Sequence, residues 1–222
     1  LDSPEEYVDE LKIFLEKYKL NLDVKINSVS NNYVVGVISN EKFEEIKKQE
    51  NKNAQTIIYR DSPVFKDPRS KKLGSRVLSN LEKLYLTIKK LALKIEDNNN
   101  YFSMAHEAGV PIKNLRELQN NLFGLEANFE DLSAIDFKKG CYIGQENTAR
   151  MKLKNKIRKK LLPLISEDNL KIGSEITLNG DSIGKLLIGN PYPFGLINIF
   201  NKNLSELKNK EILVGKQKAK II

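Results

Sequence analysis

The feature that most constrains the fold is a change of texture after Leu161. From there to the C-terminus, short apolar runs alternate with turn-forming residues: Gly173, Asn179-Gly180, Gly184, Gly189, Pro191, Pro193, Gly195 and Gly215. This punctuation is typical of short antiparallel strands, and Asn-Gly is a strong signal for a type I′ hairpin. The sequence therefore predicts a small β-barrel-like C-terminal domain at residues 158–222, after an α+β region at residues 1–157.

The first region mixes helix and strand patterns. Ser3-Pro4-Glu5-Glu6 has the pattern of a capping box, and apolar residues recur at helical spacing up to Tyr18, which predicts a helix that packs on a core. Strands are expected at residues 22–29, 33–38 and 55–59, a loop at 63–76, and helices at 42–49, 81–95 and 101–108. The single histidine, His106, falls near the end of the last helix, where a cation interacts favourably with the helix dipole, so we expect a structural role for it.

The only cysteine lies in the run Lys139-Gly140-Cys141-Tyr142-Ile143-Gly144-Gln145-Glu146. Residues 147–151 contain no Pro or Gly and predict a short helix, so Cys141 would precede a helix N-terminus. The free N–H groups there and the nearby Lys139 would favour a thiolate. The flanking glycines suggest a positive φ or a close approach to a ligand. The alternative is a small buried hydrophobic residue, which the local residues alone favour.

Basic residues are concentrated around this cysteine. The net charge is +8, and residues 138–160 hold nine Lys or Arg and one acid, Glu146. Lys152, Lys154, Lys156 and Arg158 alternate with other residues, and a period of two on a strand would place all four on one face. Such a face would be either solvated or anion-binding. An anionic ligand, an acidic protein surface or RNA would suit it, although no RNA-binding motif is present.

Composition narrows the class of protein. A single cysteine cannot form a disulfide within the chain, which fits a reducing cytoplasm, and no apolar run is long enough to predict a membrane span. One His and one Cys make a zinc or iron–sulfur site of the chain's own improbable, so no metal site is expected. Nucleotide-binding and serine-hydrolase motifs are absent. These features predict a cytoplasmic, monomeric protein with no membrane partner.

Residues 139–146 resemble the K-G-C-[FY]-x-G-Q-E signature of the YgfZ family. These are folate-binding proteins related to the T-protein (aminomethyltransferase) of the glycine cleavage system, with a mitochondrial branch that acts in iron–sulfur assembly. Further segments resemble the family in the same order: Asp67-Pro68-Arg69 with Leu73-Gly74 and Arg76, Gly109-Val110-Pro111, Leu125-Glu126-Ala127-Asn128-Phe129, and Arg150-Met151 with Arg158-Lys159-Lys160. The chain departs from the family at Ala105, where an arginine is frequent, at Leu153-Lys154-Asn155, where the family has His-Arg-Gly, and in having no counterpart of the family's N-terminal segment.

The resemblance implies an α+β, aminomethyltransferase (GcvT/YgfZ)-like folate-binding fold with a small C-terminal β-barrel domain. It implies a protein that binds tetrahydrofolate, or a one-carbon or polyglutamyl derivative, and that supports iron–sulfur enzymes or their assembly proteins. Cys141 would be the functional thiol, tuned by Lys139. The expected cofactor-binding residues are Glu126, Gly140, Tyr142, Gly144, Gln145, Glu146 and Arg150.

Glu126 stands in an apolar setting, where an unpaired carboxylate is costly. A pterin ring presents an N–H and an amino group side by side, which a carboxylate can accept in two parallel hydrogen bonds. In the related aminomethyltransferases a glutamate of this segment binds the pterin; the other interpretation is an ion pair with an arginine. Two other functions stay open: a folate-dependent aminomethyltransferase, whose class lacks this cysteine, and an RNA-associated factor for tRNA modification.

Overall fold

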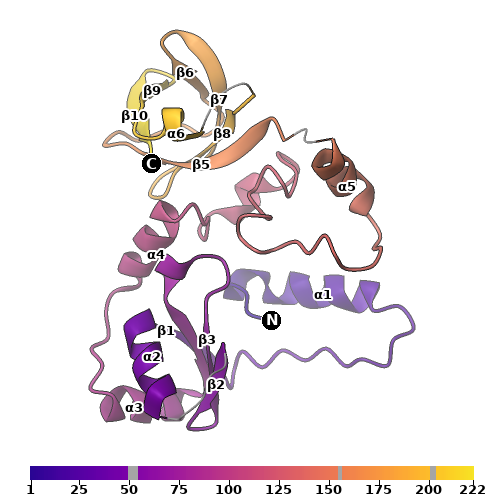
Figure 1. The fold of residues 1–222 in the computed structure, drawn as a ribbon, viewed down its shortest axis with the longest axis vertical. Helices are drawn as coiled ribbons and strands as arrows, with labels where there is room; N and C mark the ends of the chain where they lie inside the picture. Colours follow the sequence, from indigo (N-terminus) through magenta and orange to yellow (C-terminus); the bar gives the residue numbers. More distant parts are fainter. Residues whose placement is uncertain (50–54, 155–156, 201–203) are drawn as a thin grey trace. The chain divides into compact units, whose positions relative to one another are not determined.

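The structure is a computed structural model that describes residues 1–49, 55–154, 157–200 and 204–222 (Figure 1). Its elements are η1 (Glu5–Tyr7), α1 (Val8–Tyr18), β1 (Val34–Ile38), α2 (Asn40–Gln49), β2 (Thr56–Tyr59), β3 (Ser62–Lys66), η2 (Lys71–Leu73), β4 (Ser75–Ser79), α3 (Leu81–Lys90), α4 (Asn98–Glu107), η3 (Leu115–Leu118), α5 (Gln145–Leu153), β5 (Lys159–Ile165), β6 (Glu175–Leu178), β7 (Asp181–Ile188), β8 (Phe194–Asn198), α6 (Leu204–Leu207), β9 (Glu211–Val214) and β10 (Gln217–Ile221).

The chain divides into two compact units. The first contains Leu1–Lys66 and Gly74–Ile95, and the second contains Asp67–Leu73 and Glu96–Ile222. The limit predicted between residues 157 and 158 coincides with the start of the barrel strand β5 inside the second unit. The predicted limit therefore separates the barrel from the preceding segment of the same unit, and it does not separate the two units.

An antiparallel sheet with strand order β1-β4-β3-β2 forms the centre of the first unit. The strands at β1 and β2 and the helix α2 were expected, but the loop predicted at residues 63–76 is wrong, because it contains β3, η2 and β4. Pro63 lies near the start of β3, where a strand tolerates a missing N–H. Several residues of this segment are polar or charged, including the buried Asp67 and Ser75, and composition alone does not separate such a segment from a loop.

One face of this sheet is covered by helices. Phe43 and Ile46 of α2 pack on strand residues that include Ile57, Val64 and Val77. At the start of β4, Gly74 has a φ of +70°, and a Cβ at this position would lie 2.3 Å from the carbonyl oxygen of Ile38. The Leu-Gly pair of the sequence motif is thus required by the close approach of two backbones.

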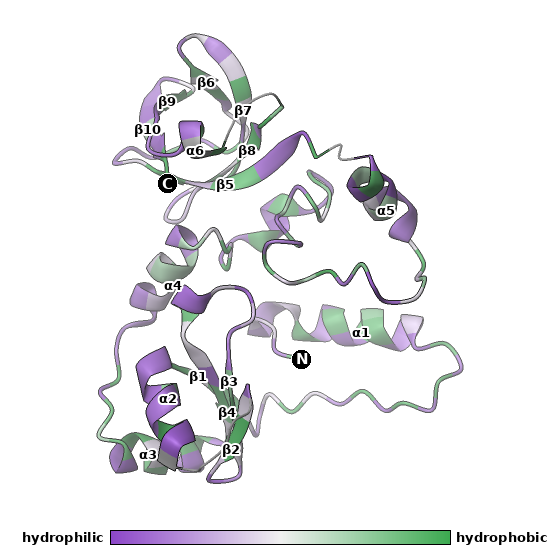
Figure 2. Cartoon of the chain, in the orientation of Figure 1, coloured by the Kyte–Doolittle hydropathy of each residue, from purple (hydrophilic) through white to green (hydrophobic). Residues whose placement is uncertain are grey.

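The predicted N-terminal helix is present, but its expected contacts are not. Neither η1 nor α1 has a side-chain cap, and Ser3 Oγ instead lies 3.3 Å from the carbonyl oxygen of Pro4. Figure 2 shows apolar residues interspersed with polar ones along α1. None of the residues of α1 is buried: Phe14 and Tyr18 are 56% and 49% exposed and pack on each other, with ring centres 4.5 Å apart. The predicted capping box and core packing are therefore wrong.

The strand expected at residues 22–29 is also wrong, because these residues have no regular structure. A strand needs a partner for its backbone groups. The sheet order places β1 at an edge, paired with β4 alone, so residues 22–29 add no strand beside it.

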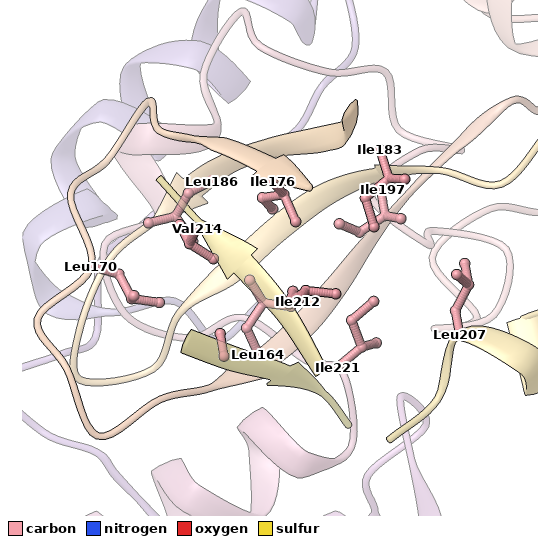
Figure 3. Packing of buried hydrophobic residues seen from close by; sticks show 11 residues of the cluster. Leu164, Leu170, Ile176, Ile183, Leu186, Ile197, Leu207, Ile212, Val214 and Ile221 are labelled. Atoms are coloured by element: carbon pink, nitrogen blue, oxygen red, sulfur yellow. The ribbon is translucent and has the colours of Figure 1, made fainter. Parts of the chain in front are cut away.

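The second unit contains a closed six-stranded barrel in the order β10-β5-β8-β7-β6-β9. Asn179 and Gly180 have φ values of 54° and 92° and join β6 to β7, as the Asn-Gly signal predicts for a type I′ turn. The interior is filled by aliphatic side chains, among them Leu164, Ile176, Leu186 and Ile197 (Figure 3). The predicted C-terminal β-barrel is confirmed.

Two of the sequence motifs meet beside α4. Arg69 donates from Nε and Nη2 to the two carboxylate oxygens of Asp67 at 3.0 and 2.8 Å, and from Nη2 to the hydroxyl of Tyr101 at 3.0 Å. The hydrogen bond to Asp67 raises the pKa of Arg69. Leu73, Ala105 and Val110 form a buried apolar cluster in the same unit. Ala105, which stands where the family often has arginine, is therefore a packing residue.

His106 connects α4 to the turn that precedes β8. Its side chain is buried, its Nε2 lies 2.9 Å from the carbonyl oxygen of Pro193, and its ring meets that of Phe194 edge-on at 5.1 Å. Burial lowers the pKa of His106, so the ring is neutral near pH 7 and donates from Nε2–H. The expected structural role holds, although the residue acts as a buried donor and not as a cation at a helix end.

This burial predicts a pH dependence of stability. His106 of the unfolded chain takes up a proton below about pH 6.5, whereas the folded protein binds it only at lower pH. The free energy of unfolding should therefore fall by up to about 1.4 kcal/mol per pH unit as the pH drops below about 6.5. His106→Gln, which keeps a donor but does not titrate, should flatten this slope. Thermal melts of both proteins from pH 7.5 to 5.5 measure it, and equal slopes would contradict the assignment. His106 is the only histidine, so no second imidazole contributes.

Candidate functional site

Cys141 lies in an exposed loop immediately before α5. The thiol is free and its residue is exposed, so the interpretation as a buried hydrophobic residue is wrong. The helix predicted at residues 147–151 is confirmed and is longer, since α5 runs from Gln145 to Leu153. Gly144 is its N-cap with a φ of +88°, whereas Gly140 has no positive φ, and a Cβ on either glycine would meet no atom within 4 Å. The expected left-handed conformation is therefore confirmed at Gly144 alone.

The loop is closed on the helix by one residue. The backbone N–H of Tyr142 donates to Gln145 Oε1 at 3.2 Å, and the N–H of Gln145 donates to the Tyr142 carbonyl at 3.3 Å. The Lys139 ammonium lies 4.3 Å from the centre of the Tyr142 ring. A cation is attracted to the face of an aromatic ring. Lys139 therefore holds its positive charge over the ring of Tyr142, the residue that follows Cys141 in the chain.

The other predicted residues of this segment lie on α5. Glu146 and Arg150 are exposed and four residues apart, which places them on the same face of the helix. The segment from Lys139 to Arg150 thus contains eight of the predicted residues, of which all but the half-buried Gln145 are exposed: Lys139, Gly140, Cys141, Tyr142, Gly144, Gln145, Glu146 and Arg150.

Lys152 anchors α5. Its ammonium forms an ion pair with Glu130 and lies 5.1 Å from the centre of the Phe137 ring. The basic strand face predicted for Lys152, Lys154, Lys156 and Arg158 is wrong for the described residues: Lys152 is in the helix, Lys154 is its C-cap, and Arg158 precedes β5 with its guanidinium 4.9 Å from the Phe200 ring. Lys156 lies outside the described residues. The helical preference of the Ala-Arg-Met-Lys-Leu run outweighs the alternation of charges.

Glu126 occupies a separate, partly buried turn. Its Oε2 accepts a hydrogen bond from the backbone N–H of Phe123 at 3.0 Å. Among the described residues no cation pairs with this carboxylate, so the alternative of an ion pair with arginine finds no partner there. In the described part of the chain no hydrogen bond or ion pair joins Glu126 to residues 139–146, so the two parts of the predicted site are not linked by polar contacts.

Strand β5 fixes the position of the Glu126 turn. The N–H of Leu161 donates to the carbonyl oxygen of Glu126 at 2.8 Å, and Asn128 Nδ2 donates to the Leu161 carbonyl at 2.6 Å. Asn128 is buried, has a φ of +62°, and its Oδ1 has no hydrogen-bond partner. We name these two bonds the Leu161 clamp. The role of Asn128 was not predicted; the available signal was a short polar residue, able to adopt a positive φ, inside an apolar run.

Over the described ranges, no group of three or more His, Cys, Asp or Glu side chains could hold a metal ion. In the same part of the chain, no helix is both long and apolar enough to cross a bilayer.

The sequence is similar to curated proteins that carry two different names. It is 30% identical over 168 residues, 74% of this chain and 40% of the relative, to the mitochondrial iron-sulfur cluster assembly factor IBA57 homolog of Dictyostelium discoideum. It is 31% identical over 173 residues, 74% of this chain and 53% of the relative, to the tRNA-modifying protein YgfZ of Buchnera aphidicola. The matches thus cover about half or less of each relative's length. No family model matches the sequence.

The fold has a solved counterpart. The aminomethyltransferase T of the glycine cleavage system from Bartonella henselae superposes with a TM-score of 0.64 over 97% of this chain and 64% of that one, at 14% identity. This similarity confirms the predicted α+β, aminomethyltransferase-like fold.

The predicted location needs correction. A bacterial cytoplasmic protein was expected, but the IBA57 relatives are named as mitochondrial proteins, which contradicts this expectation. The low cysteine content on which the expectation relied cannot separate one reducing compartment from another.

The IBA57 and YgfZ similarities agree with the aminomethyltransferase fold and with the motif that surrounds Cys141, and together they support a YgfZ/GcvT-like family for this chain.

Proposed function

We propose that this protein supports iron–sulfur cluster assembly as a folate-binding factor that uses Cys141 as its functional thiol. The observation that carries the proposal is the exposed Cys141 in the loop closed by Tyr142 and Gln145. Two relatives whose names specify iron–sulfur cluster assembly, from Dictyostelium discoideum and Homo sapiens, support the assembly role at 30% and 32% identity.

Glu126 fits the donor pattern of a pterin. The carboxylate accepts one hydrogen bond from the backbone N–H of Phe123 and has no cationic partner among the described residues. It therefore retains lone pairs for a second interaction. Tetrahydrofolate, when bound, supplies a carrier for one-carbon groups. The contribution of this chain is to hold the Glu126 turn on β5 through the Leu161 clamp.

Cys141 contributes a thiol that is accessible to other molecules. The lone cysteine has no intrachain partner for a disulfide, so its covalent or metal-directed chemistry involves a ligand or another protein. Lys139 stands two residues before the thiol and α5 begins four residues after it, so a lysine and a helix N-terminus flank Cys141 in the sequence.

The first prediction concerns the thiol. Cys141→Ser should abolish the rescue of iron–sulfur enzyme activity in cells that lack the protein, while the melting temperature stays within about 1 °C of the parent, because exposed substitutions change stability little. Enzyme assays in complemented cells and thermal melts measure the two effects. Normal rescue by the serine variant would refute the role of the thiol, and a large loss of stability would reassign it to packing.

The second prediction concerns reactivity. Cys141 should react with iodoacetamide faster than glutathione does at neutral pH, and Lys139→Gln should slow it. Lys138→Gln is the matched control, because it removes the same charge one residue earlier and Lys138 has no ring contact with Tyr142 in the described structure. A single cysteine makes the rate unambiguous. Equal rates for the two lysine variants would show that Lys139 does not tune the thiol.

The third prediction tests the ligand class. Glu126→Ala should cost on the order of 2–4 kcal/mol in tetrahydrofolate binding, or roughly 30-fold to 1000-fold in affinity, because a charge-assisted pair is lost. Glu126→Gln keeps an acceptor for the Phe123 N–H and should lose most of the same affinity without unfolding the turn. Glu117→Gln, an exposed carboxylate of η3, is the control. Calorimetry that finds parental affinity in both Glu126 variants would make the carboxylate a purely structural group.

A further inference from the structure

The outer surface of the barrel has a pocket that the proposed function does not use. Its volume is about 410 Å³, and the residues that line it include Asn121, Lys159, Ser182, Lys185, Leu196 and Asn198. They come from β5, β7, β8 and the turn after η3, all inside the second unit. We call it the barrel pocket. Its volume falls in the range of small-molecule sites, roughly 300–1,000 Å³.

Strand register places the two lysines on either side of β8. Lys159 on β5 is opposite Asn198, and Lys185 on β7 is opposite Leu196. Two strands that flank a third are on the order of 10 Å apart. The pocket therefore has positive charge on two separate sides and not at a single point.

The remaining polar groups of the barrel pocket are mainly donors. Asn198 Oδ1 accepts from the backbone N–H of Phe200 at 3.0 Å, which leaves its amide N–H groups available. Ser182 adds a hydroxyl. Asn121 uses one amide hydrogen on the carbonyl of Glu117 and keeps its oxygen. None of the lining residues is acidic, and within the described part of the chain neither Lys159 nor Lys185 has an acidic partner.

Not every lysine of β5 is without an acidic partner. Lys160, the next residue, forms an ion pair with Asp131. Lys159 and Lys185 form no ion pair within the described part of the chain, although Glu175 of β6 is opposite Lys185 in the register, and both lysines adjoin neutral donors and an apolar wall. The lining holds no aromatic side chain, which disfavours stacking on a nucleic-acid base.

We propose that the barrel pocket binds a small organic dianion, whose two anionic groups pair with Lys159 and Lys185 while Asn198 and Ser182 donate hydrogen bonds. Charge-assisted hydrogen bonds are the strongest contacts available to such groups. Phosphate and carboxylate groups share this chemistry, and the two arms of the test below distinguish them.

Calorimetric titration of the 222-residue chain tests the proposal with fructose 1,6-bisphosphate in one arm and adipate in the other. At least one of them should bind, and its single-anion counterpart, fructose 6-phosphate or hexanoate, should bind about 10-fold more weakly, the equivalent of one hydrogen bond to a charged group. Lys159→Gln and Lys185→Gln should each weaken the dianion by a similar factor. Binding by one arm alone identifies the anionic group.

Lys218→Gln is the matched control, because Lys218 is exposed on β10 and does not line the pocket. Its affinity for the dianion should equal that of the parent. Equal losses in Lys218→Gln and the pocket variants would show binding to net positive charge alone and would overturn the proposal, as would the absence of binding in both arms. Melting curves of all three variants confirm that each is folded.

Discussion

The second unit depends on the hydrogen bonds made by the backbone of one barrel residue, Leu161. Leu161 directs its N–H to the carbonyl of Glu126 and its carbonyl to the side chain of Asn128. A buried backbone group without a partner is costly, so these two bonds join the turns before α5 to the barrel. From this joint the chain continues to Glu130 and Asp131, which pair with Lys152 and Lys160. The Glu126 turn, the helix α5 and the barrel are therefore held by one chain of interactions.

The sequence predicted the barrel better than the sheet of the first unit, because the turns of the barrel are encoded by the residues that form them. With turns such as Asn179-Gly180, the order of strands and breaks is readable. Strands β3 and β4 carry Pro63 and several polar residues, and only pairing with neighbours makes them strands. The reverse holds at residues 22–29, which have a strand-like pattern but no partner. Strand propensity is realised only where a second strand is available.

The candidate site was likewise predictable only where local sequence determines the structure. The run around Cys141 and the start of α5 were readable, because a helix without Pro or Gly follows a glycine. The ring contact of Lys139, the hydrogen bond from Phe123 to Glu126 and the function of Asn128 were not readable, since each depends on turn geometry. The barrel pocket was beyond sequence reasoning, because Asn121, Lys159 and Lys185 are far apart along the chain.

The partners of the individual Lys and Arg side chains are therefore more informative than the net charge of the chain. The basic run after Cys141 is divided among separate tasks: Lys152 and Lys160 pair with acids, and Arg158 lies over the Phe200 ring. Charges used in this way add little to a long-range field, because an ion pair is nearly neutral beyond a Debye length. Within the described residues, Lys139 keeps its charge over the Tyr142 ring, and the two lysines of the barrel pocket form no ion pair. A continuous basic surface of the kind that tracks a nucleic-acid backbone is thus replaced by small, separate positive sites, and such sites suit small anionic ligands better than a polyanion.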